Sequence, residues 1–329
     1  MRMTKAPSLV IGVLCGISAN LLWGLAFLIP VLLPTSDSVA VALGRYLCFG
    51  VVSVGVVIFT RGAAMRGLDR RIWLTALAFA FAGHVGYYFF LVQGITHAGS
   101  PISTVIIGTL PVTVALTGNW VRKEFPFSRL LLPLGFITVG LVLVNLKEVD
   151  WGTAFSGHSG MTWVMGIAST LVALGLWTWY AVANASFLRR HPEISSANWS
   201  TLMGLCALEL SLVALPIAGV SGGMHIDGSS LLPVIIGSVV LGVLVSWVGT
   251  VLWNRSSGLV PISIAGQLAV VQMISGLIYV FAWYRRMPPL LELFGIVLLI
   301  GGVLLAIQRT RKIPPVAAAQ PADKAEVAS

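Results

Sequence analysis

Charged residues are scarce in this chain. Asp, Glu, Lys and Arg make up 9% of its 329 residues, whereas a typical soluble domain carries about 25% charged residues. Hydrophobic residues account for 57% of the sequence. A water-soluble protein of this length could not cover its surface with so few charges. The composition therefore excludes an ordinary soluble domain.

Cysteines are few, and a nucleotide-binding loop is missing from the sequence. Cys15, Cys48 and Cys206 fall in separate apolar runs, without the spacing of a disulfide framework or a metal site. We interpret them as small hydrophobic residues and expect neither a metal nor another cofactor. No Walker-type loop ending in Gly-Lys-Ser/Thr occurs, so the chain is not expected to be an ATPase itself.

Long apolar runs dominate the sequence instead. Each run of roughly 20 residues has the length that spans a ~30 Å hydrocarbon core. Backbone groups in lipid must form their hydrogen bonds internally, so each run is predicted to be a helix. The expected fold class is an all-α polytopic membrane protein with ten transmembrane helices. The predicted spans are 8–33, 39–59, 72–92, 101–120, 130–145, 161–185, 200–220, 231–252, 261–283 and 289–307.

The basic residues of the loops predict the orientation, because Lys and Arg are retained on the cytoplasmic side of a membrane. If the N-terminus is cytoplasmic, 16 of the 20 basic residues lie on that side and three, Lys147, Arg285 and Arg286, lie on the other. We therefore expect a multi-pass protein of the cytoplasmic (inner) membrane with both termini cytoplasmic. The net charge of +9 lies in short loops, so no nucleic-acid partner is expected.

The sequence contains an internal repeat. Pro-Ile-Ser occurs at 101–103 and again at 261–263, and the same separation relates Gly135 to Gly295. Five spans per copy is an odd number, so the second copy is predicted to cross the membrane in the opposite sense. Chance similarity between apolar helices is the alternative. The predicted organisation is an N-terminus at 1–7, repeats at 8–145 and 161–307, an extracytoplasmic linker at 146–160 and a disordered cytoplasmic tail at 308–329.

Three ionisable side chains lie within predicted spans: Arg45, His84 and Glu209. A charge at this depth costs at least ~2.5–3.5 kcal/mol, so such residues usually face a cavity or a partner. We expect Arg45 to attract an anionic group and Glu209 to exchange a proton or hold an amine, and their depths allow a pair. The structural alternatives are an ion pair, a snorkelling Arg45, a protonated Glu209 and a hydrogen-bonded packing role for His84.

Aromatic and amide side chains supply further candidates. Trp23 and Trp177 lie in the first span of each half, and Tyr87 lies deep in the third. Such rings line cavities for apolar, aromatic or cationic groups, although bulk packing is the alternative for each. Gln267 occupies the position that Ile107 holds in the first copy, so the halves differ chemically. The tryptophans near span ends are interpreted as interfacial anchors; they are Trp73, Trp120, Trp151, Trp163, Trp199, Trp253 and Trp283.

Short motifs along residues 8–310 carry a family resemblance. They are Asn20-Leu-Leu-Trp-Gly24, Ala42-Leu-Gly-Arg-Tyr46, Ala98-Gly-Ser-Pro-Ile-Ser103 running on to Leu110-Pro111, and Glu124 after the fourth span. With these motifs the chain resembles the drug/metabolite transporter superfamily, in particular its EamA-type ten-helix members. The resemblance implies two inverted five-helix repeats and export or exchange of small metabolites, including amino acids. The second copy departs from it, with Tyr284-Arg-Arg where the first has Lys123-Glu124.

We therefore expect a secondary active transporter, exporting amino acids or similar small metabolites by alternating access. The expected partners are a small-molecule substrate, membrane lipid and protons as the candidate coupling ion. An integral membrane enzyme or a lipid-translocating protein is the alternative, but the five histidines are scattered, so an enzyme is not expected. The candidate substrate-binding or coupling residues are Arg45, Glu209, Trp23, Trp177, Tyr87, His84 and Gln267.

Overall fold

The computed structural model describes residues 6–33, 38–145, 160–220 and 231–311, and the regular elements in these ranges are all helical. Ten helical stretches are long and apolar enough to cross a membrane, which confirms the predicted fold class. The predicted linker lies almost wholly outside the described residues, as do most of the N-terminal segment and of the C-terminal tail.

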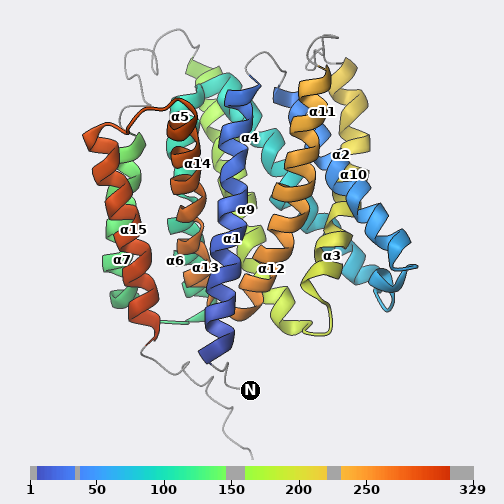
Figure 1. Ribbon diagram of the computed structural model, residues 1–329, viewed down its shortest axis with the longest axis horizontal. Helices are drawn as coiled ribbons and strands as arrows, with labels where there is room; N and C mark the ends of the chain where they lie inside the picture. Colours follow the sequence, from blue (N-terminus) through green and yellow to red (C-terminus); the bar gives the residue numbers. More distant parts are fainter. Residues whose placement is uncertain (1–5, 34–37, 146–159, 221–230, 312–329) are drawn as a thin grey trace, which may run out of the picture.

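The ten stretches follow the chain in order, and four of them consist of more than one helical segment (Figure 1). A short 3₁₀ turn, η1 (Ala63–Met65), precedes the third stretch. The stretches are α1 (Ala6–Leu32), α2 (Ser38–Phe59), α3 (Arg70–Ala80) with η2 (Phe81–Val85) and α4 (Gly86–Ala98), α5 (Ser100–Gly108) with α6 (Leu110–Arg122), α7 (Phe127–Asn145), α9 (Gly160–Arg190), α10 (Ser196–Val220), α11 (Leu231–Val240) with η3 (Leu241–Val248) and α12 (Gly249–Leu259), α13 (Ile262–Leu268) with α14 (Val270–Trp283), and α15 (Leu290–Arg311).

The interruptions of these helices recur at the spacing of the sequence repeat. The π-helical segments η2 and η3 begin at Phe81 and Leu241, which are as far apart in the chain as the two Pro-Ile-Ser motifs. The breaks between α5 and α6 and between α13 and α14 fall at Thr109 and Ala269, with the same separation again. The sequence repeat therefore has a counterpart in the backbone.

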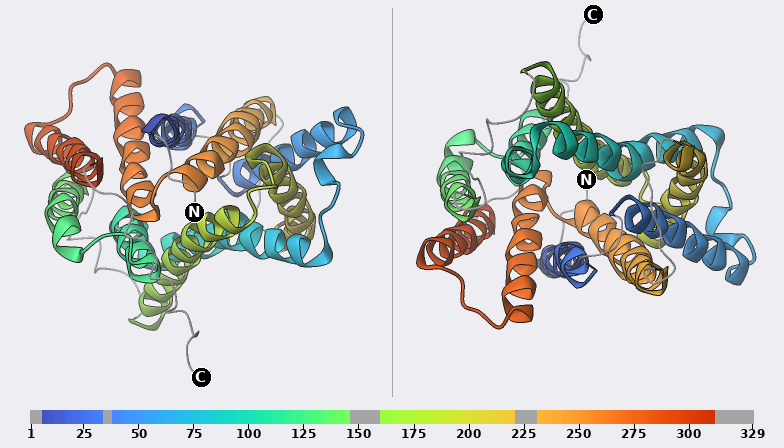
Figure 2. Two further views of the ribbon diagram at one scale, coloured as in Figure 1. Left: turned by 90° about the horizontal axis from the view of Figure 1, so that it is seen from below. Right: turned by 90° about the horizontal axis from the view of Figure 1, so that it is seen from above.

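The two halves of the chain intermix in space. The helix α2 packs against α10, α4 against α9, α6 against α13, α7 against α15, and α1 against both α12 and α14. Each of these pairs joins a helix before residue 146 to a helix after residue 159. Seen from the two ends of the bundle, α7 and α15 lie together at one edge (Figure 2). The interior is consequently built from both halves.

The third stretch continues beyond its predicted end at residue 92. The helix α4 runs through Gly94 and ends before Gly99, whose φ of 87° interrupts it. Gly94 supports close packing here, because a Cβ atom at this position would lie 2.0 Å from Oγ1 of Thr170 on α9. Gly94, which lies beyond the predicted span, therefore belongs to a helix–helix contact.

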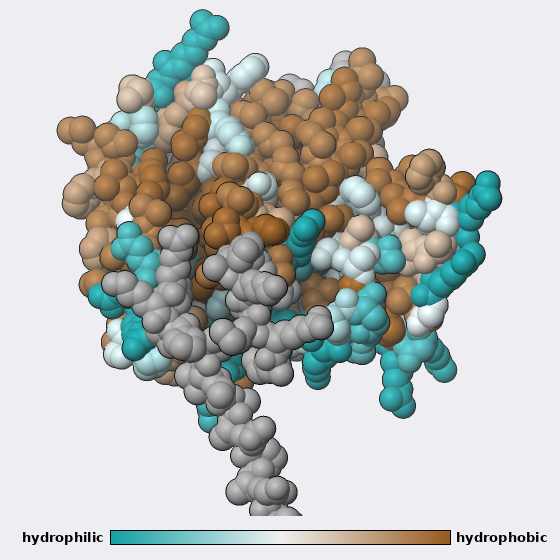
Figure 3. Space-filling view, turned by 60° about the horizontal axis from the view of Figure 1, so that its bottom comes forward, coloured by the Kyte–Doolittle hydropathy of each residue, from teal (hydrophilic) through white to brown (hydrophobic). Residues whose placement is uncertain are grey.

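The outer side of the bundle is largely hydrophobic, as lipid exposure requires. Figure 3 shows hydrophobic residues over most of this surface and hydrophilic ones gathered towards the end turned forward, where α1 begins. Arg285 and Arg286 follow α14 at the opposite end. The basic residues near the end at which α1 begins are Arg61, Arg66, Arg70, Arg71, Arg122, Lys123, Arg129, Arg189, Arg190, Arg255 and Arg309.

The interpretation of Trp199 and Trp253 as interfacial anchors is wrong. Their exposed fractions are 0% and 1%. The indole N–H of Trp199 donates to Oδ1 of Asn184 at 2.7 Å, and its ring stacks on Phe187 with centroids 4.4 Å apart. Position along a span gives the depth of a residue but not the direction of its side chain. Trp120 is exposed, as its predicted interfacial role requires.

Candidate substrate cavity

A cavity of about 350 Å³ lies between the two halves of the bundle. Lining residues come from α1, α2, η2, α4, α5, α6 and α7 in the first half, and from α9, η3, α12 and α14 in the second. Five of the seven candidate residues line it, namely Trp23, Arg45, His84, Tyr87 and Trp177. The structure therefore brings together most of the residues selected from the sequence.

The cavity extends from the middle of the bundle towards the end with few basic residues. Trp177 and Tyr180 lie near the middle of α9, whereas Phe27 lies near the end of α1 and Ile95 near the end of α4. Both of these helices end opposite the side at which α1 begins (Figure 1). The lining thus lies at midplane and in the half of the bundle away from the basic loops.

Arg45 brings a positive charge to the cavity wall. It is half-buried on α2, and its Nε donates a hydrogen bond to Oγ of Ser246 at 2.7 Å. Its guanidinium lies over the Tyr46 ring, with Cζ 5.4 Å from the ring centroid. It forms no ion pair with any residue in the described ranges. Ser246 belongs to η3, so this contact joins the two halves.

The aromatic wall depends on the π-helical segment η3. The indole N–H of Trp23 donates to the backbone carbonyl of Val245 at 2.9 Å. Gly249 leaves room for this approach, because a Cβ atom there would lie 2.6 Å from Nε1 of Trp23. Trp177 meets Trp23 edge-on, with ring centroids 6.3 Å apart and an interplanar angle of 78°. These indoles form a rigid apolar surface within the bundle.

His84 lies in η2, where its ring is surrounded by other aromatic rings. The centroids of Tyr46, Phe49 and Tyr180 lie 5.9, 5.6 and 5.9 Å from it. Its Nε2 has no hydrogen-bond partner in the described part of the chain, and neither has Oγ1 of Thr250. Both residues line the cavity. A bound molecule can therefore supply partners for these two buried atoms.

At the basic end of the bundle, Glu124 joins the halves directly. Its Oε1 accepts the Ile262 N–H at 2.8 Å and its Oε2 accepts the Ser263 N–H at 2.9 Å, so it satisfies free donors in the first turn of α13. The Ser263 hydroxyl also donates to Oε2. Nη1 of Arg189 lies 3.6 Å from Oε1, and Arg189 donates to the carbonyls of Ser257 and Val260. We call this group the Glu124 clamp.

The comparisons with known proteins agree with this architecture. The EamA-like transporter family model matches residues 10–146. The "Inner membrane protein YtfF" of Escherichia coli (strain K12) is 35% identical over 316 residues, which cover 93% of this chain and 98% of that protein. The chain belongs to the EamA-like transporter family. This confirms the resemblance and, because the family consists of transporters, the expectation that the protein is not an enzyme.

Two further comparisons add detail on this EamA-like transporter. The "Uncharacterized transporter sll0355" of Synechocystis is 27% identical over 160 residues, which cover 44% of this chain and 45% of that protein. A solved structure described as "Crystal structure of protein" matches with a TM-score of 0.73 and 17% identity, covering 91% of this chain and 97% of its own. At this identity the match concerns the fold alone.

Two candidate residues of this EamA-like transporter lie outside the cavity lining. Glu209 is exposed on the outer side of α10, and no ion pair joins it to Arg45 in the described structure. Gln267 is buried in α13, where its Nε2 donates to the Ser263 carbonyl at 3.0 Å. Tyr180 also lines the cavity, although it is not among the candidate residues predicted from the sequence. Its position three residues after Trp177 places both side chains on one helix face, and this spacing is the signal that could have found it.

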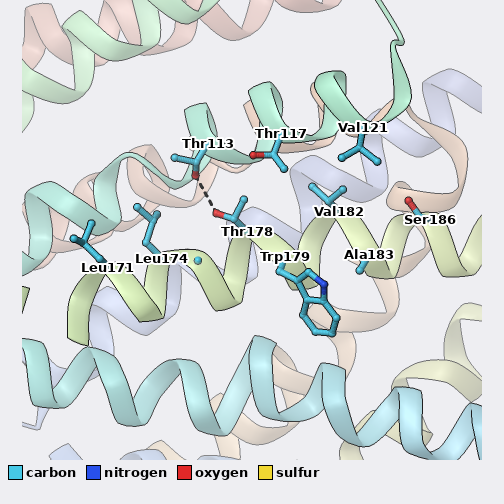
Figure 4. Close-up of a pocket in the computed structure, with 11 residues that line it drawn as sticks. Thr113, Thr117, Val121, Leu171, Leu174, Thr178, Trp179, Val182, Ala183 and Ser186 are labelled. Carbon is cyan, nitrogen blue, oxygen red and sulfur yellow. Dashed lines mark hydrogen bonds between the residues drawn. The ribbon is translucent and has the colours of Figure 1, made fainter. Parts of the chain in front are cut away.

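A second hollow of about 530 Å³ lies between α6 and α9 (Figure 4). Oγ1 of Thr113 and Oγ1 of Thr178 are 3.1 Å apart across it. Val121, Leu171 and Trp179 in its lining are exposed, and its described lining contains no charged residue. This hollow therefore opens on the apolar outer surface, and the central cavity remains the better candidate for a substrate site of this EamA-like transporter.

Proposed function

We propose that this protein is a secondary active transporter of the inner membrane, which exports amino acids or similar small metabolites by alternating access. The observation that carries the proposal is the cavity of about 350 Å³ between the two halves, with Arg45 in its wall. Its volume falls in the range of small-molecule sites. The name of the E. coli relative and the many basic loop residues at one end of the bundle support the inner membrane as the location.

The proposal includes an inverted arrangement of the two halves. The support for it is that the same number of residues separates several matching features. This number separates the two Pro-Ile-Ser motifs in the sequence, and it also separates Phe81 from Leu241 and Thr109 from Ala269 in the backbone. Halves of five spans each must enter the membrane from opposite sides. Rocking of such halves around a midplane site would expose that site to each side in turn.

The Glu124 clamp supports a specific step of this cycle. The cavity reaches towards the end with few basic residues, whereas Glu124 and Arg189 hold the halves together at the other end. We propose that the clamp closes the cytoplasmic side and opens when the cavity turns inward. Broken contacts between Glu124 and the Ile262 and Ser263 amides would free α13 to move relative to α6.

Solute counterflow tests this function. The purified protein is reconstituted into liposomes loaded with one unlabelled solute at a time, and uptake of the same labelled solute is followed. We expect saturable counterflow of at least one amino acid or small carboxylate, and none in liposomes without protein. Translocation of labelled lipid without counterflow of any solute would contradict the proposal and favour the lipid-translocating alternative.

A further inference from the structure

The described lining of the cavity carries a positive charge and no negative one. Arg45 carries the only permanent charge among the described lining residues. The carboxylates nearest to the spans lie elsewhere: Glu124 binds the amides of α13, Glu209 is exposed on α10, and Glu292 is buried on α15. No described carboxylate therefore lines the cavity to neutralise Arg45 or to receive a cationic group.

Arg45 also retains free hydrogen-bonding capacity. A guanidinium has five N–H donors, and only its Nε–H has a partner in the described structure, namely Ser246. The remaining donors form the fork that binds a carboxylate through two parallel hydrogen bonds. Lysine would offer a point charge without this planar geometry. The site is thus prepared for one planar anionic group.

The charge of the ligand decides the net charge of the occupied cavity. A buried positive charge without a counter-ion is unfavourable at membrane depth. A monoanion neutralises Arg45, a zwitterion leaves the cavity positive, and a cation makes it more positive. The electrostatics therefore favour the monoanion.

The remaining lining defines the body of the ligand. Trp23, Trp177 and Tyr180 provide flat apolar surfaces, which suit an aromatic or branched apolar group. His84 and Thr250 each present one unpartnered buried polar atom. Tyr87, Thr104 and Gln272 add uncharged polar side chains to the lining, so the ligand can also form neutral hydrogen bonds.

From these observations we infer that the cavity selects small organic monoanions with an aromatic or apolar body over zwitterions and cations of the same shape. The inference rests on the proposed function, because it takes the cavity to be the substrate site. Among the amino acids and similar small metabolites of that proposal, it favours carboxylates without an ammonium group over the amino acids themselves.

A series of four ligands isolates the charge. The four ligands share a phenyl ring on a two-carbon chain and differ in the polar groups on that chain. 3-Phenylpropionate carries a carboxylate, 3-phenylpropionamide an uncharged amide, phenylalanine a carboxylate and an ammonium group, and phenethylamine an ammonium group alone. Their binding to the purified full chain is measured by calorimetry at neutral pH. We expect 3-phenylpropionate to bind at least about tenfold more tightly than each of the others. Arg45→Gln should remove this advantage and Arg45→Lys should retain part of it.

Arg255→Gln is the matched control. It removes one positive charge from an exposed position on α12, outside the cavity, and should leave the binding order unchanged. If Arg45→Gln does not fold, the comparison of 3-phenylpropionate with its uncharged amide in the unaltered protein still decides the question.

Three results would each overturn the inference. They are binding of phenylalanine or phenethylamine as tight as that of 3-phenylpropionate, binding of none of the four ligands, and an undiminished preference in a folded Arg45→Gln protein. Counterflow with the wider solute panel separates such a failure from a failure of the proposed function. Exchange of zwitterionic amino acids there would leave the transporter intact and reject only the selectivity for anions.

Discussion

At the scale of single residues, Arg45 and Glu209 show that the position of a residue along a helix does not by itself determine whether its side chain faces the cavity. Both occupy the interior of predicted spans. Arg45 faces the cavity and contacts Ser246 of the other half, whereas Glu209 lies on the outer side of α10. Depth follows from the number of residues to the end of a span, but the rotation of a helix about its axis follows from its packing. The sequence therefore predicted the cavity position of one of these residues and not the outward position of the other.

The Glu124 clamp yields a prediction at this scale. Glu124→Gln should lower the free energy of unfolding by about 1–3 kcal/mol, because a charged acceptor of two amide donors becomes neutral. The melting temperature in detergent measures the effect. In the double variant Glu124→Gln/Arg189→Gln, the loss of unfolding free energy should be smaller than the sum of the losses in the two single variants, because each substitution breaks the same ion pair.

Glu193→Gln is the matched control for this cycle. Glu193 pairs with His191 at an exposed position after α9, where such pairs add little to stability. We expect its melting temperature to remain that of the unaltered protein. Strictly additive losses at Glu124 and Arg189 would show that the two side chains do not act together.

At the scale of helices, close approach between backbones explains contacts across the halves. The helix α7 packs against α15 through Gly140 and Gly295, where a Cβ atom would lie 2.8 Å or 3.0 Å from the carbonyl oxygen of the other glycine. Small residues at such interfaces allow the dense packing that holds helices together in lipid. The sequence shows these glycines but not which helix each one meets.

A pair of alanine substitutions on α7 tests this packing. Gly140→Ala places a Cβ atom 2.8 Å from the carbonyl oxygen of Gly295, so we expect a loss of about 1–3 kcal/mol. Gly135→Ala meets nothing within 4 Å and should not destabilise the protein. Melting temperatures of the two variants provide the comparison, and equal values would contradict the assignment of Gly140 to a tight contact.

At the scale of the whole molecule, one end of the bundle carries most of the described basic residues, and α1 begins at that end. Because Lys and Arg are retained in the cytoplasm, we expect the start of α1 to lie inside the cell. The same orientation would direct the cavity outward and the Glu124 clamp inward. The orientation of the protein in the membrane therefore decides which side of the membrane the cavity faces in this conformation.

Cysteine labelling in intact cells tests the orientation. Cys15, Cys48 and Cys206 are first replaced by alanine, and a single cysteine is then introduced at Met287 or at Glu193, both of which are exposed. A membrane-impermeant thiol reagent should label Met287→Cys and not Glu193→Cys. Permeabilised cells should show labelling of both. The reverse pattern in intact cells would invert the topology.

The sequence by itself determined the fold class, the number of spans and the spacing of the internal repeat, because apolar run length and backbone hydrogen bonding in lipid are local properties. It also named five residues of the cavity, since ionisable side chains within spans are exceptional and indole and phenol groups deep in a span need partners. Only the tertiary structure decided which side chains face one another. It placed Glu209 outside, joined Arg45 to Ser246 and Glu124 to α13, and buried Trp199 and Trp253. The physical reason is that the rotation of each helix depends on packing with helices far away in the chain.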